Sequence, residues 1–299
     1  MSDKVAIVTG SNTGIGFQTA KSLATQGFTV VMACRDEIKA KRAMEALTGP
    51  LYMPVVFMQL DTSSLASAKA FAQAFAKRFS RLDALVLNAG TGYVKKELRS
   101  TEDGNEAILQ INYLSHWLIT QHLMPILERT PDARVVCLSS CEHRDRIETD
   151  WDKLNAKTAP SSYSASKLAM TLFAFELAQR TGLIAAAANP GGVASDIWRY
   201  MDDWKGWYTW AHKKLQEHIL LTVAQGAATS IYAATALLPK GECVYVTPFA
   251  AVPLLPYTSD AIGPFNGPTV RQAAPQAYDR AEQQRLWEWS ARVCAKFMP

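Results

Sequence analysis

Residues 9–16 read TGSNTGIG and follow directly on the apolar run VAIV of residues 5–8. Three glycines stand within eight residues, between a strand-like segment and the helical pattern of residues 17–26. In a parallel sheet, a loop at this place directs its amides and the helix amino end to one point, which suits a bound pyrophosphate. Glycine lets the backbone turn and approach the ligand without a Cβ in the way. A glycine-rich tight turn without a ligand is the alternative.

The rest of the chain repeats this strand–helix order. Apolar runs without clean alternation predict strands buried on both faces, at residues 4–9, 29–34, 55–60, 84–88, 134–139, 183–188 and 243–246. Helical patterns lie between and after them, at residues 17–26, 64–79, 104–127, 162–181, 222–237 and 277–297. This order predicts an α/β fold with a single doubly wound Rossmann-type domain over residues 1–299. Its seven-stranded, mainly parallel sheet carries helices on both faces.

Two regions interrupt this order. Residues 195–221 include the run WRYMDDWKGWYTWAHKK and are predicted to form a substrate lid. Residues 247–269 are rich in proline and predict an irregular surface stretch, within an irregular C-terminal extension over residues 247–299. The aromatic rings of the lid could contact an apolar or aromatic substrate, pack onto the body or a second subunit, or touch a membrane surface.

The composition limits the class of protein. Of the 299 residues, 48% are hydrophobic and 19% are charged, which supports a large core and argues against disorder. The net charge of +4 is spread along the chain and does not imply nucleic acid. Five cysteines without a CxxC pair, and no apolar run of membrane-spanning length, favour a cytoplasmic protein with free thiols. No histidine spacing indicates a metal site.

The end of the second predicted strand, VVMACRD at residues 30–36, indicates which cofactor binds. A dinucleotide fold that binds NAD carries Asp or Glu here to hold the ribose hydroxyls. This chain has Cys34 at that place, followed by Arg35, whose guanidinium suits the 2′-phosphate of NADP. The alternative is that Arg35 only ends the strand and pairs with Asp36. The sequence favours NADP(H).

Tyr163 and Lys167 lie in the motif YSASK, one helical turn apart on one face. The ammonium is expected to lower the pKa of the phenol, so that Tyr163 exchanges a proton near neutral pH. Such a pair arises by chance in many chains and needs support from other residues. Four predicted strands end in polar or glycine residues at the edge where such sheets carry their sites: Asp61, Asn88, Ala89, Gly90, Ser139, Ser140, Pro190, Gly191 and Gly192. Helix capping is the alternative for each Ser or Asp.

These pieces together resemble the short-chain dehydrogenase/reductase family, in its shorter, non-extended branch. The matching motifs stand in family order and cover about residues 4–200: TGSNTGIG, LDTSS, LNAG, INYLSHWLIT, VVCLSS, YSASK and NPGGVASDI. The strings ACRDEIKAKRA, SSCEH and YSASKLAM resemble more narrowly the retinol-dehydrogenase-like and protochlorophyllide-reductase-like subgroup. Members of that subgroup mostly use NADP.

The resemblance implies a catalytic tetrad of Asn112, Ser140, Tyr163 and Lys167. Tyr163 would be the acid/base, and Ser140 would hold the substrate oxygen. Lys167 would hold ribose and tune Tyr163, while Asn112 would order a water in a proton relay. Ser140 is preferred to Ser139 because the family's serine is the last residue of this strand motif. The resemblance also implies cofactor contacts from Tyr163 and Lys167, and from Gly10, Ser11, Asn12, Gly14, Ile15, Gly16, Arg35, Asp61, Asn88, Ala89, Gly90, Pro190, Gly191, Val193 and Ser195.

The predicted function is reversible hydride transfer between NADP(H) and a carbonyl/alcohol pair, on a small-molecule substrate that is apolar or aromatic. No metal is predicted, and the apolar helix after Lys167 leaves a homodimer open. A catalytically idle NADP-binding regulatory or scaffold protein is one alternative, although the intact tetrad argues against it. An isomerase of the extended branch is another, but the glycine spacing here is TGxxxGxG and the tail is short.

Overall fold

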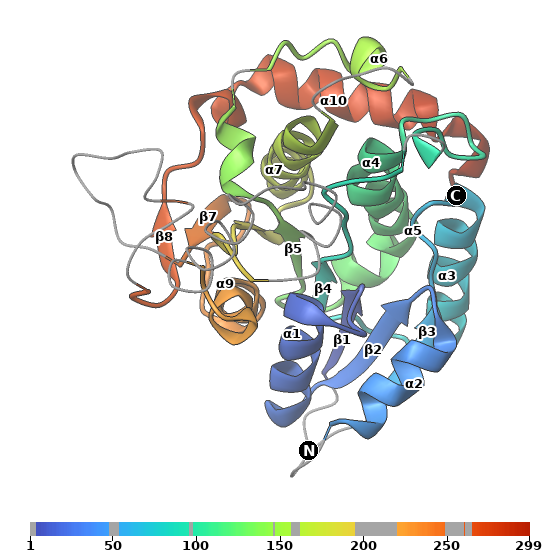
Figure 1. Ribbon diagram of the computed structural model, residues 1–299, viewed down its shortest axis with the longest axis vertical. Coiled ribbons are helices and arrows are strands. Elements are labelled where there is room, and N and C mark those ends of the chain that lie inside the picture. Colours follow the sequence, from blue (N-terminus) through green and yellow to red (C-terminus); the bar gives the residue numbers. More distant parts are fainter. Residues whose placement is uncertain are drawn as a thin grey trace, which may run out of the picture.

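The computed structural model describes residues 4–47, 54–95, 98–145, 147–156, 162–194, 220–248, 260 and 265–299. Eight strands form one sheet in the order β3-β2-β1-β4-β5-β6-β7-β8 (Figure 1). They are β1 (Val5–Thr9), β2 (Thr29–Cys34), β3 (Val55–Gln59), β4 (Ala84–Leu87), β5 (Arg134–Leu138), β6 (Ile184–Ala188), β7 (Cys243–Thr247) and β8 (Thr269–Arg271). The first seven are parallel and match the seven predicted strands, and β8 pairs antiparallel with β7.

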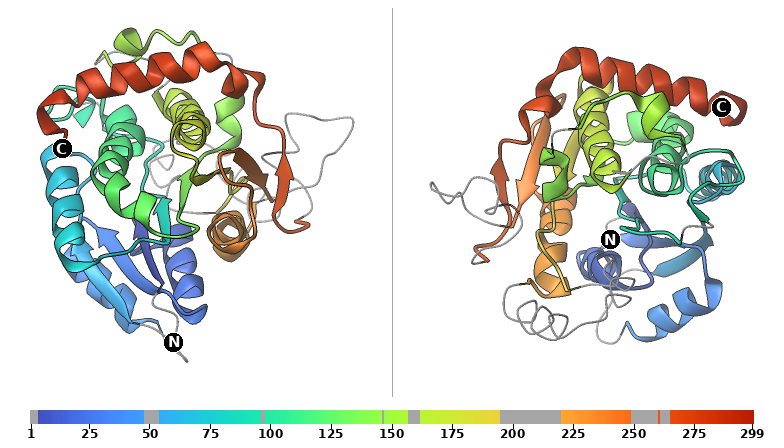
Figure 2. Two further views of the ribbon diagram at one scale, coloured as in Figure 1. Left: turned by 180° about the vertical axis from the view of Figure 1, so that it is seen from behind. Right: turned by 45° about the horizontal axis from the view of Figure 1, so that its top comes forward.

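Helices cover both faces of this sheet (Figures 1 and 2). On one face, α1 (Gly14–Thr25), α2 (Glu37–Glu45) and α9 (Val223–Thr235) bury Leu23, Ala43 and Ala233 among apolar strand residues. On the other face lie α3 (Leu65–Arg78), α5 (Ser115–Arg129) and α7 (Ser162–Thr181). The fold is therefore the predicted doubly wound α/β domain.

The sheet reverses its strand order at β1. This strand pairs with β2 on one side and β4 on the other, so the connections leave its carboxyl end in opposite directions. Ligands of open α/β sheets bind in the crevice at such a point, outside the carboxyl ends of the strands. The topology thus places TGSNTGIG and the ends of β4 and β5 around one location.

Two segments differ from the predicted elements. The sequence EIKAKRAME was not predicted as a helix but forms α2, which begins at Asp36, whose side chain accepts a hydrogen bond from the Lys39 amide. The predicted helix 104–127 consists of α4 (Ala107–Leu109), a π-helical turn η2 (Gln110–Leu114) and α5. Gly104, with φ of 86°, lies in the turn before them.

The C-terminal extension holds the helix predicted at residues 277–297, together with short elements that were not predicted. It contains β8, the 3-10 turn η7 (Pro275–Tyr278), α10 (Arg280–Val293) and a second 3-10 turn η8 (Ala295–Phe297). The helix α10 lies across α7 (Figures 1 and 2), where Trp287 packs against Phe173 with ring centroids 5.9 Å apart. The apolar run after Lys167 is therefore buried within this chain, and the homodimer stays a prediction.

Within the described ranges, no helix combines the length and the apolar character that crossing a membrane requires. The cytoplasmic location stays a prediction. The Trp-rich segment predicted as a lid lies, apart from its last two residues, outside the described residues.

Candidate active site

The glycine loop lies between β1 and α1, and α1 begins inside it at Gly14. Gly10 and Gly14 have φ values of 64° and 59°, in the left-handed region that favours glycine. A Cβ on Gly16 would lie 2.5 Å from Asn88 Nδ2 and 2.6 Å from the Gly10 carbonyl oxygen, so no side chain fits there. The first turn of α1 holds no acidic residue, and the Thr13 side chain does not cap it. Its amides therefore suit an anionic group.

The end of β4 fixes this loop in place. Thr9 Oγ1 accepts hydrogen bonds from the amides of Asn88 and Ala89, both at 2.8 Å. Asn88 Nδ2 donates to the Thr9 carbonyl at 2.7 Å. A Cβ on Gly10 would lie 2.9 Å from Ala89 Cα, which shows how closely the two segments approach. Asn88 and Ala89 thus brace the glycine loop from the neighbouring strand.

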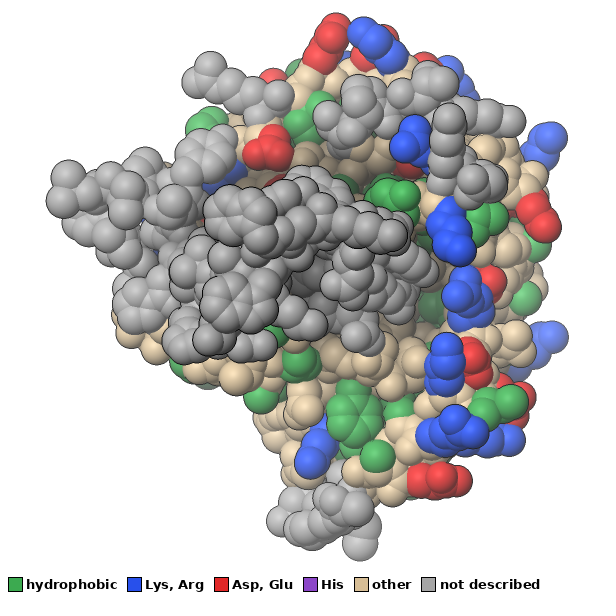
Figure 3. All heavy atoms as spheres, viewed as in Figure 1, with side chains coloured by type: hydrophobic (Ala, Val, Ile, Leu, Met, Phe, Trp, Pro, Cys, Tyr) green, Lys and Arg blue, Asp and Glu red, His purple; other side chains and the backbone are tan. Residues whose placement is uncertain are grey.

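The end of β2 lies beside the same loop. Cys34 is buried with its thiol 3.6 Å from Ser11 Oγ, and burial raises the pKa of this thiol. Arg35 is exposed and forms no hydrogen bond or ion pair with any residue that the structure describes. Asp36 caps α2 and pairs with Lys39 at 3.7 Å, so it is not the partner of Arg35. Figure 3 shows further Lys and Arg side chains on the side of the molecule that carries α2 and α3.

The loops after β3 and β6 also lie at the carboxyl edge of the sheet. One carboxylate oxygen of Asp61 accepts from the Ser63 amide at 2.9 Å and from its hydroxyl at 2.6 Å, so that oxygen forms a turn. Gly191 has φ of 76° and donates its amide to Asn189 Oδ1 at 2.9 Å. Pro190 and Asn12 are half-buried near these turns.

The two ends of the predicted lid are joined. Val193 forms an isolated parallel bridge with Leu221, and Ile15 of the glycine loop packs against this pair. The Leu221 amide donates to the Gly192 carbonyl at 2.8 Å. Ser195 lies outside the described residues.

Tyr163 and Lys167 lie in the first two turns of α7, next to the end of β5. The side chain of Lys167 is buried, donates from Nζ to the Leu138 carbonyl at 2.9 Å, and lies 5.5 Å from the Tyr163 ring centroid. The hydroxyl of Ser140 lies beside the phenol of Tyr163. Ser139 instead turns toward α7, where its Oγ lies 2.8 Å from Thr171 Oγ1. Of the two serines, only Ser140 faces the tyrosine.

Asn112 lies in the π-helical turn η2, a feature often found at functional sites. Its Oδ1 accepts from the Thr91 amide at 2.8 Å, and its Nδ2 donates to Ser166 Oγ at 2.9 Å. A Cβ on Gly90 would lie 3.2 Å from Asn112 Oδ1 and 3.7 Å from Lys167 Nζ. Asn112 and Lys167 therefore meet at Gly90, beside the tyrosine.

The electrostatics of this cluster differ from the expectation for Tyr163. Its pKa lies above the usual value of 10, because burial disfavours the phenolate and the charge of Glu142 adds to this, while the nearby Ser140 hydroxyl opposes it. The expected lowering of the phenol pKa by Lys167 is thus not seen. Burial lowers the pKa of Lys167 itself from 10.5 to about 8, against the opposing charge of Glu142.

His116 is a further contact of the site that the sequence did not single out. Thr9 Oγ1 already accepts two amide hydrogens, so it donates its own hydrogen, and His116 Nε2 at 3.0 Å is a nearer acceptor than the Val86 carbonyl at 3.5 Å. His116 Nδ1 then donates to the Asn112 carbonyl at 2.9 Å. Burial lowers the pKa of this imidazole to about 4, so it is neutral. The spacing of four residues from Asn112 on a helix was the only sequence signal.

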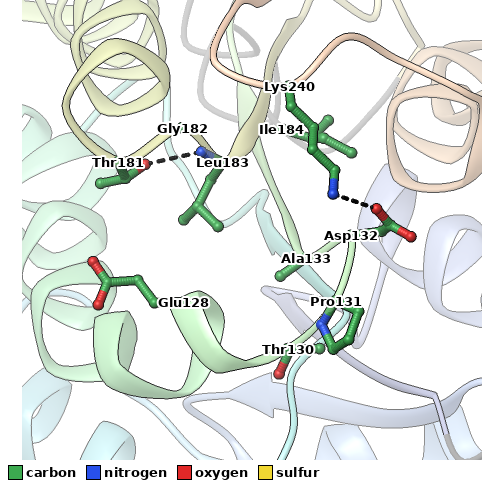
Figure 4. Close-up of a pocket in the computed structure, with 10 residues that line it drawn as sticks. All are labelled: Glu128, Thr130, Pro131, Asp132, Ala133, Thr181, Gly182, Leu183, Ile184 and Lys240. Carbon is green, nitrogen blue, oxygen red and sulfur yellow. Dashed lines mark hydrogen bonds and ion pairs between the residues drawn. The ribbon is translucent and has the colours of Figure 1, made fainter.

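A pocket of about 400 Å³ lies at the opposite end of β5 and β6 and is unrelated to this cluster (Figure 4). It is lined by Glu128, Pro131, Leu183 and others, and Lys240 pairs with Asp132 at 2.8 Å across its rim. Its lining residues lie at the amino ends of these strands and at the ends of the helices that precede them, whereas the catalytic candidates lie at the carboxyl ends. Within the described ranges, no group of three or more His, Cys, Asp or Glu side chains could hold a metal ion.

Known proteins resemble this chain in sequence and fold. Residues 4–206 match the family model for short chain dehydrogenase. Human retinol dehydrogenase 13 is 32% identical over 299 residues, covering 97% of this chain and 84% of that protein. Human polyprenol dehydrogenase is 36% identical over 246 residues, covering 78% of this chain and 72% of that protein. The solved RhlG/NADP active-site complex of Pseudomonas aeruginosa has a TM-score of 0.64 at 25% identity, covering 82% of this chain and 95% of that one. This chain therefore belongs to the short-chain dehydrogenase/reductase family of oxidoreductases.

Proposed function

We propose that this protein transfers hydride reversibly between NADP(H) and a carbonyl or alcohol substrate. The observation that carries the proposal is the meeting of Asn112, Ser140, Tyr163 and Lys167 at one sheet edge, beside the glycine loop. Core packing does not require three polar side chains and a buried lysine to converge there. Proton exchange at a substrate oxygen does require an acid, a hydrogen-bond partner and a charge that holds both in place.

The residues around the glycine loop fit a dinucleotide phosphate. A Cβ at Gly10 or Gly16 would fill the space against Ala89 and Asn88, and the amino end of α1 has no side-chain cap from Thr13 and no acidic residue in its first turn. Arg35 follows the buried Cys34 where a ribose-binding acid would stand, and its guanidinium has no partner among the described residues. These features support NADP(H) over NAD(H). The related RhlG structure was solved as a complex with NADP.

The nicotinamide supplies the hydride chemistry when it is bound. Tyr163 holds its proton at neutral pH and would donate it to the substrate oxygen as a carbonyl is reduced. Ser140 stands beside the Tyr163 hydroxyl and would share the same oxygen. Lys167 is charged at neutral pH, since its pKa is about 8, and would stabilise the phenolate that remains. Asn112 holds the Gly90–Thr91 backbone in place, through its two bonds to Thr91.

The substrate is proposed to be apolar or aromatic. The names of two relatives, retinol dehydrogenase and polyprenol dehydrogenase, denote enzymes for apolar alcohols. In this chain, the segment between the joined residues Val193 and Leu221 carries four tryptophans, at positions 198, 204, 207 and 210. The described residues that flank this segment, Val193 and Leu221, lie against Ile15 of the glycine loop, which supports a role of the segment in binding the substrate.

The Tyr163→Phe variant tests the reaction. We expect it to lower kcat by about 10²- to 10⁴-fold, because the proton donor is lost while the ring remains. A fluorescence titration should give the same NADPH affinity for variant and wild type, and much weaker binding of NADH to both. Tyr278→Phe, at an exposed tyrosine, is the matched control and should keep full activity.

Three other outcomes would point elsewhere. Retention of most activity in Tyr163→Phe would refute the mechanism. Tight NADPH binding without reduction of any carbonyl in a broad panel would favour the idle NADP-binding protein. Binding of neither dinucleotide would mean that TGSNTGIG is only a turn.

A further inference from the structure

Two carboxyl groups lie beside the proposed tetrad and have no part in the mechanism above. Glu142 is in the 3-10 turn η3 (Cys141–Arg144), directly after Ser140, and Asp145 ends that turn. Both reach Ser164, the residue after Tyr163. Ser164 Oγ lies 3.0 Å from Glu142 Oε2 and 2.6 Å from Asp145 Oδ2. These contacts join the two segments that hold Ser140 and Tyr163.

The number of hydrogens in this cluster shows whether one of the two carboxyl groups carries a proton. A serine hydroxyl carries one hydrogen and can donate to only one of two carboxylates. A full bond to the other oxygen needs a proton on that carboxyl group. Glu142 is the better holder of this proton, because it is half-buried while Asp145 is exposed. Burial raises the pKa of Glu142 and the charge of Asp145 adds to this, whereas Ser164 and the Lys167 ammonium oppose it.

Glu142 is also connected to the proposed acid/base. Its amide donates to Ser140 Oγ at 3.3 Å, and Ser140 lies beside the phenol of Tyr163. Once Glu142 has lost this proton at higher pH, its negative charge is, after burial, the largest influence that keeps Tyr163 protonated. The groups that face Glu142 are Asp145 and Cys141 from its own turn, and Tyr163 and Lys167 from α7. Charge on Glu142 and charge on Tyr163 are therefore coupled.

We propose that Glu142, held by Ser164 beside Asp145, is a positioning residue whose charge sets the pH range in which Tyr163 exchanges a proton. The role rests on the proposed function of Tyr163 as acid/base. Two like charges at one site disfavour each other, so the phenolate forms more readily once the glutamate charge is gone. A role in folding alone would leave the pH dependence of the reaction unchanged.

The Glu142→Gln variant keeps an oxygen toward Ser164 and removes the charge. In a pH profile of kcat/KM for alcohol oxidation, we expect its rising limb to move to lower pH by about 0.5 to 1 pH unit. Glu148→Gln, at an exposed glutamate between Ser140 and Tyr163 in the sequence, is the matched control and should leave the rising limb in place. An unmoved limb in Glu142→Gln would overturn the proposal.

A second measurement does not depend on activity. NMR of isotope-labelled glutamate carboxyl groups should show that Glu142 of the wild type titrates at a higher pH than exposed glutamates do. In the Asp145→Asn variant, Glu142 should titrate at a lower pH than in the wild type. Ordinary titration of Glu142 in the wild type would also overturn the proposal. If no alcohol is oxidised, the proposed function fails, and the pH at which Tyr163 ionises then tests the inference through tyrosinate absorbance. The signal of Tyr163 is the one that is missing in Tyr163→Phe. It must appear at lower pH in Glu142→Gln than in the wild type.

Discussion

Lys167 carries a charge into a place where a charge is costly. Its side chain is 4% exposed, and one carbonyl, that of Leu138, accepts a hydrogen bond from it at 2.9 Å. Burial lowers its pKa from 10.5 to about 8, so it remains charged at pH 7. A shift of this size corresponds to a cost of about 3 kcal/mol in the folded state. The proposed site is therefore maintained at the expense of stability.

The Lys167→Met variant should show this trade-off directly. We expect turnover to be lost, while the free energy of unfolding at pH 7 rises by about 1 to 2 kcal/mol, since the Leu138 carbonyl also loses its donor. Between the pKa of Lys167 in the folded protein, about 8, and its ordinary value of 10.5, the unfolded wild type binds more protons than the folded wild type. The stability of the wild type therefore rises from pH 8 to 10.5, and the difference in stability between the variant and the wild type becomes smaller. Urea unfolding at pH 7 and at about pH 9.5 measures both effects. Lys153→Met, at an exposed lysine, is the control, and a less stable Lys167→Met at pH 7 would contradict the account.

Single residues were predictable from sequence where a motif specifies them. Tyr163, Lys167 and Ser140 belong to local strings whose order along the chain is informative, and the structure brings them together. His116 and Glu142 gain their contacts from other segments: His116 from Thr9 in β1, and Glu142 from Ser164 in α7. No local pattern encodes such contacts. The raised pKa of Tyr163 also depends on burial, which spacing alone does not give.

The helix α10 is the element that closes the core over α7. Trp287 lies edge-on to Trp117 with centroids 5.8 Å apart, and Ser290 Oγ lies 2.6 Å from the hydroxyl of the buried Tyr113. Leu286 of the same face is 1% exposed. The buried carboxylate of Glu176 in α7 pairs with Arg280 at the start of α10, at 2.6 Å. This helix therefore contributes to the stability of the whole domain.

The Leu286→Ala variant separates this role from function. It removes buried methyl groups from the interface of α10 with α7, and we expect the free energy of unfolding to fall by about 2 to 4 kcal/mol. Affinity for NADPH, measured well below the unfolding midpoint, should stay the same. Glu288→Ala, on the exposed face of α10, should change stability by less than about 0.5 kcal/mol. Weakened cofactor binding in Leu286→Ala would mean that α10 supports the site.

Elements were predictable where burial imposes a pattern. The strands of a parallel sheet are apolar on both faces, so β1–β7 stand out as short runs. Strand β8 has three residues at the sheet edge, and its Val270 is exposed, so it carries no such signal. Helix α2 buries two alanines, Ala40 and Ala43, and reads as polar. The π-helical turn at Asn112 is a change of backbone hydrogen bonding within a continuous helical pattern, which side-chain spacing does not reveal.

Across the whole molecule, two neutral histidines tie distant segments to the site. His116 joins the end of β1 to Asn112, as described above. His143 Nε2 accepts from the Ala274 amide at 2.9 Å and its Nδ1 donates to the Ser140 carbonyl at 2.6 Å, which fixes the C-terminal extension against the turn after β5. Each imidazole uses one nitrogen as an acceptor and so must be uncharged. Burial lowers the pKa of both, from 6.5 to about 4.

Stability should therefore fall as the pH drops from 6.5 to 4, because these two histidines bind protons in the unfolded chain and remain unprotonated in the folded protein. Each would contribute a loss of about 2 kcal/mol between pH 7 and pH 5. The carboxyl groups of Glu106 and Glu142, whose pKa values burial raises, act in the opposite sense, so the net loss of stability is smaller than the sum of the two histidine contributions.

The His143→Gln variant isolates one histidine, since glutamine keeps a donor and an acceptor and does not titrate. Urea unfolding at both pH values should show a loss about 2 kcal/mol smaller in this variant than in the wild type. Equal losses would mean that His143 accepts a proton in the folded protein, and the bond from Ala274 could then not be as described.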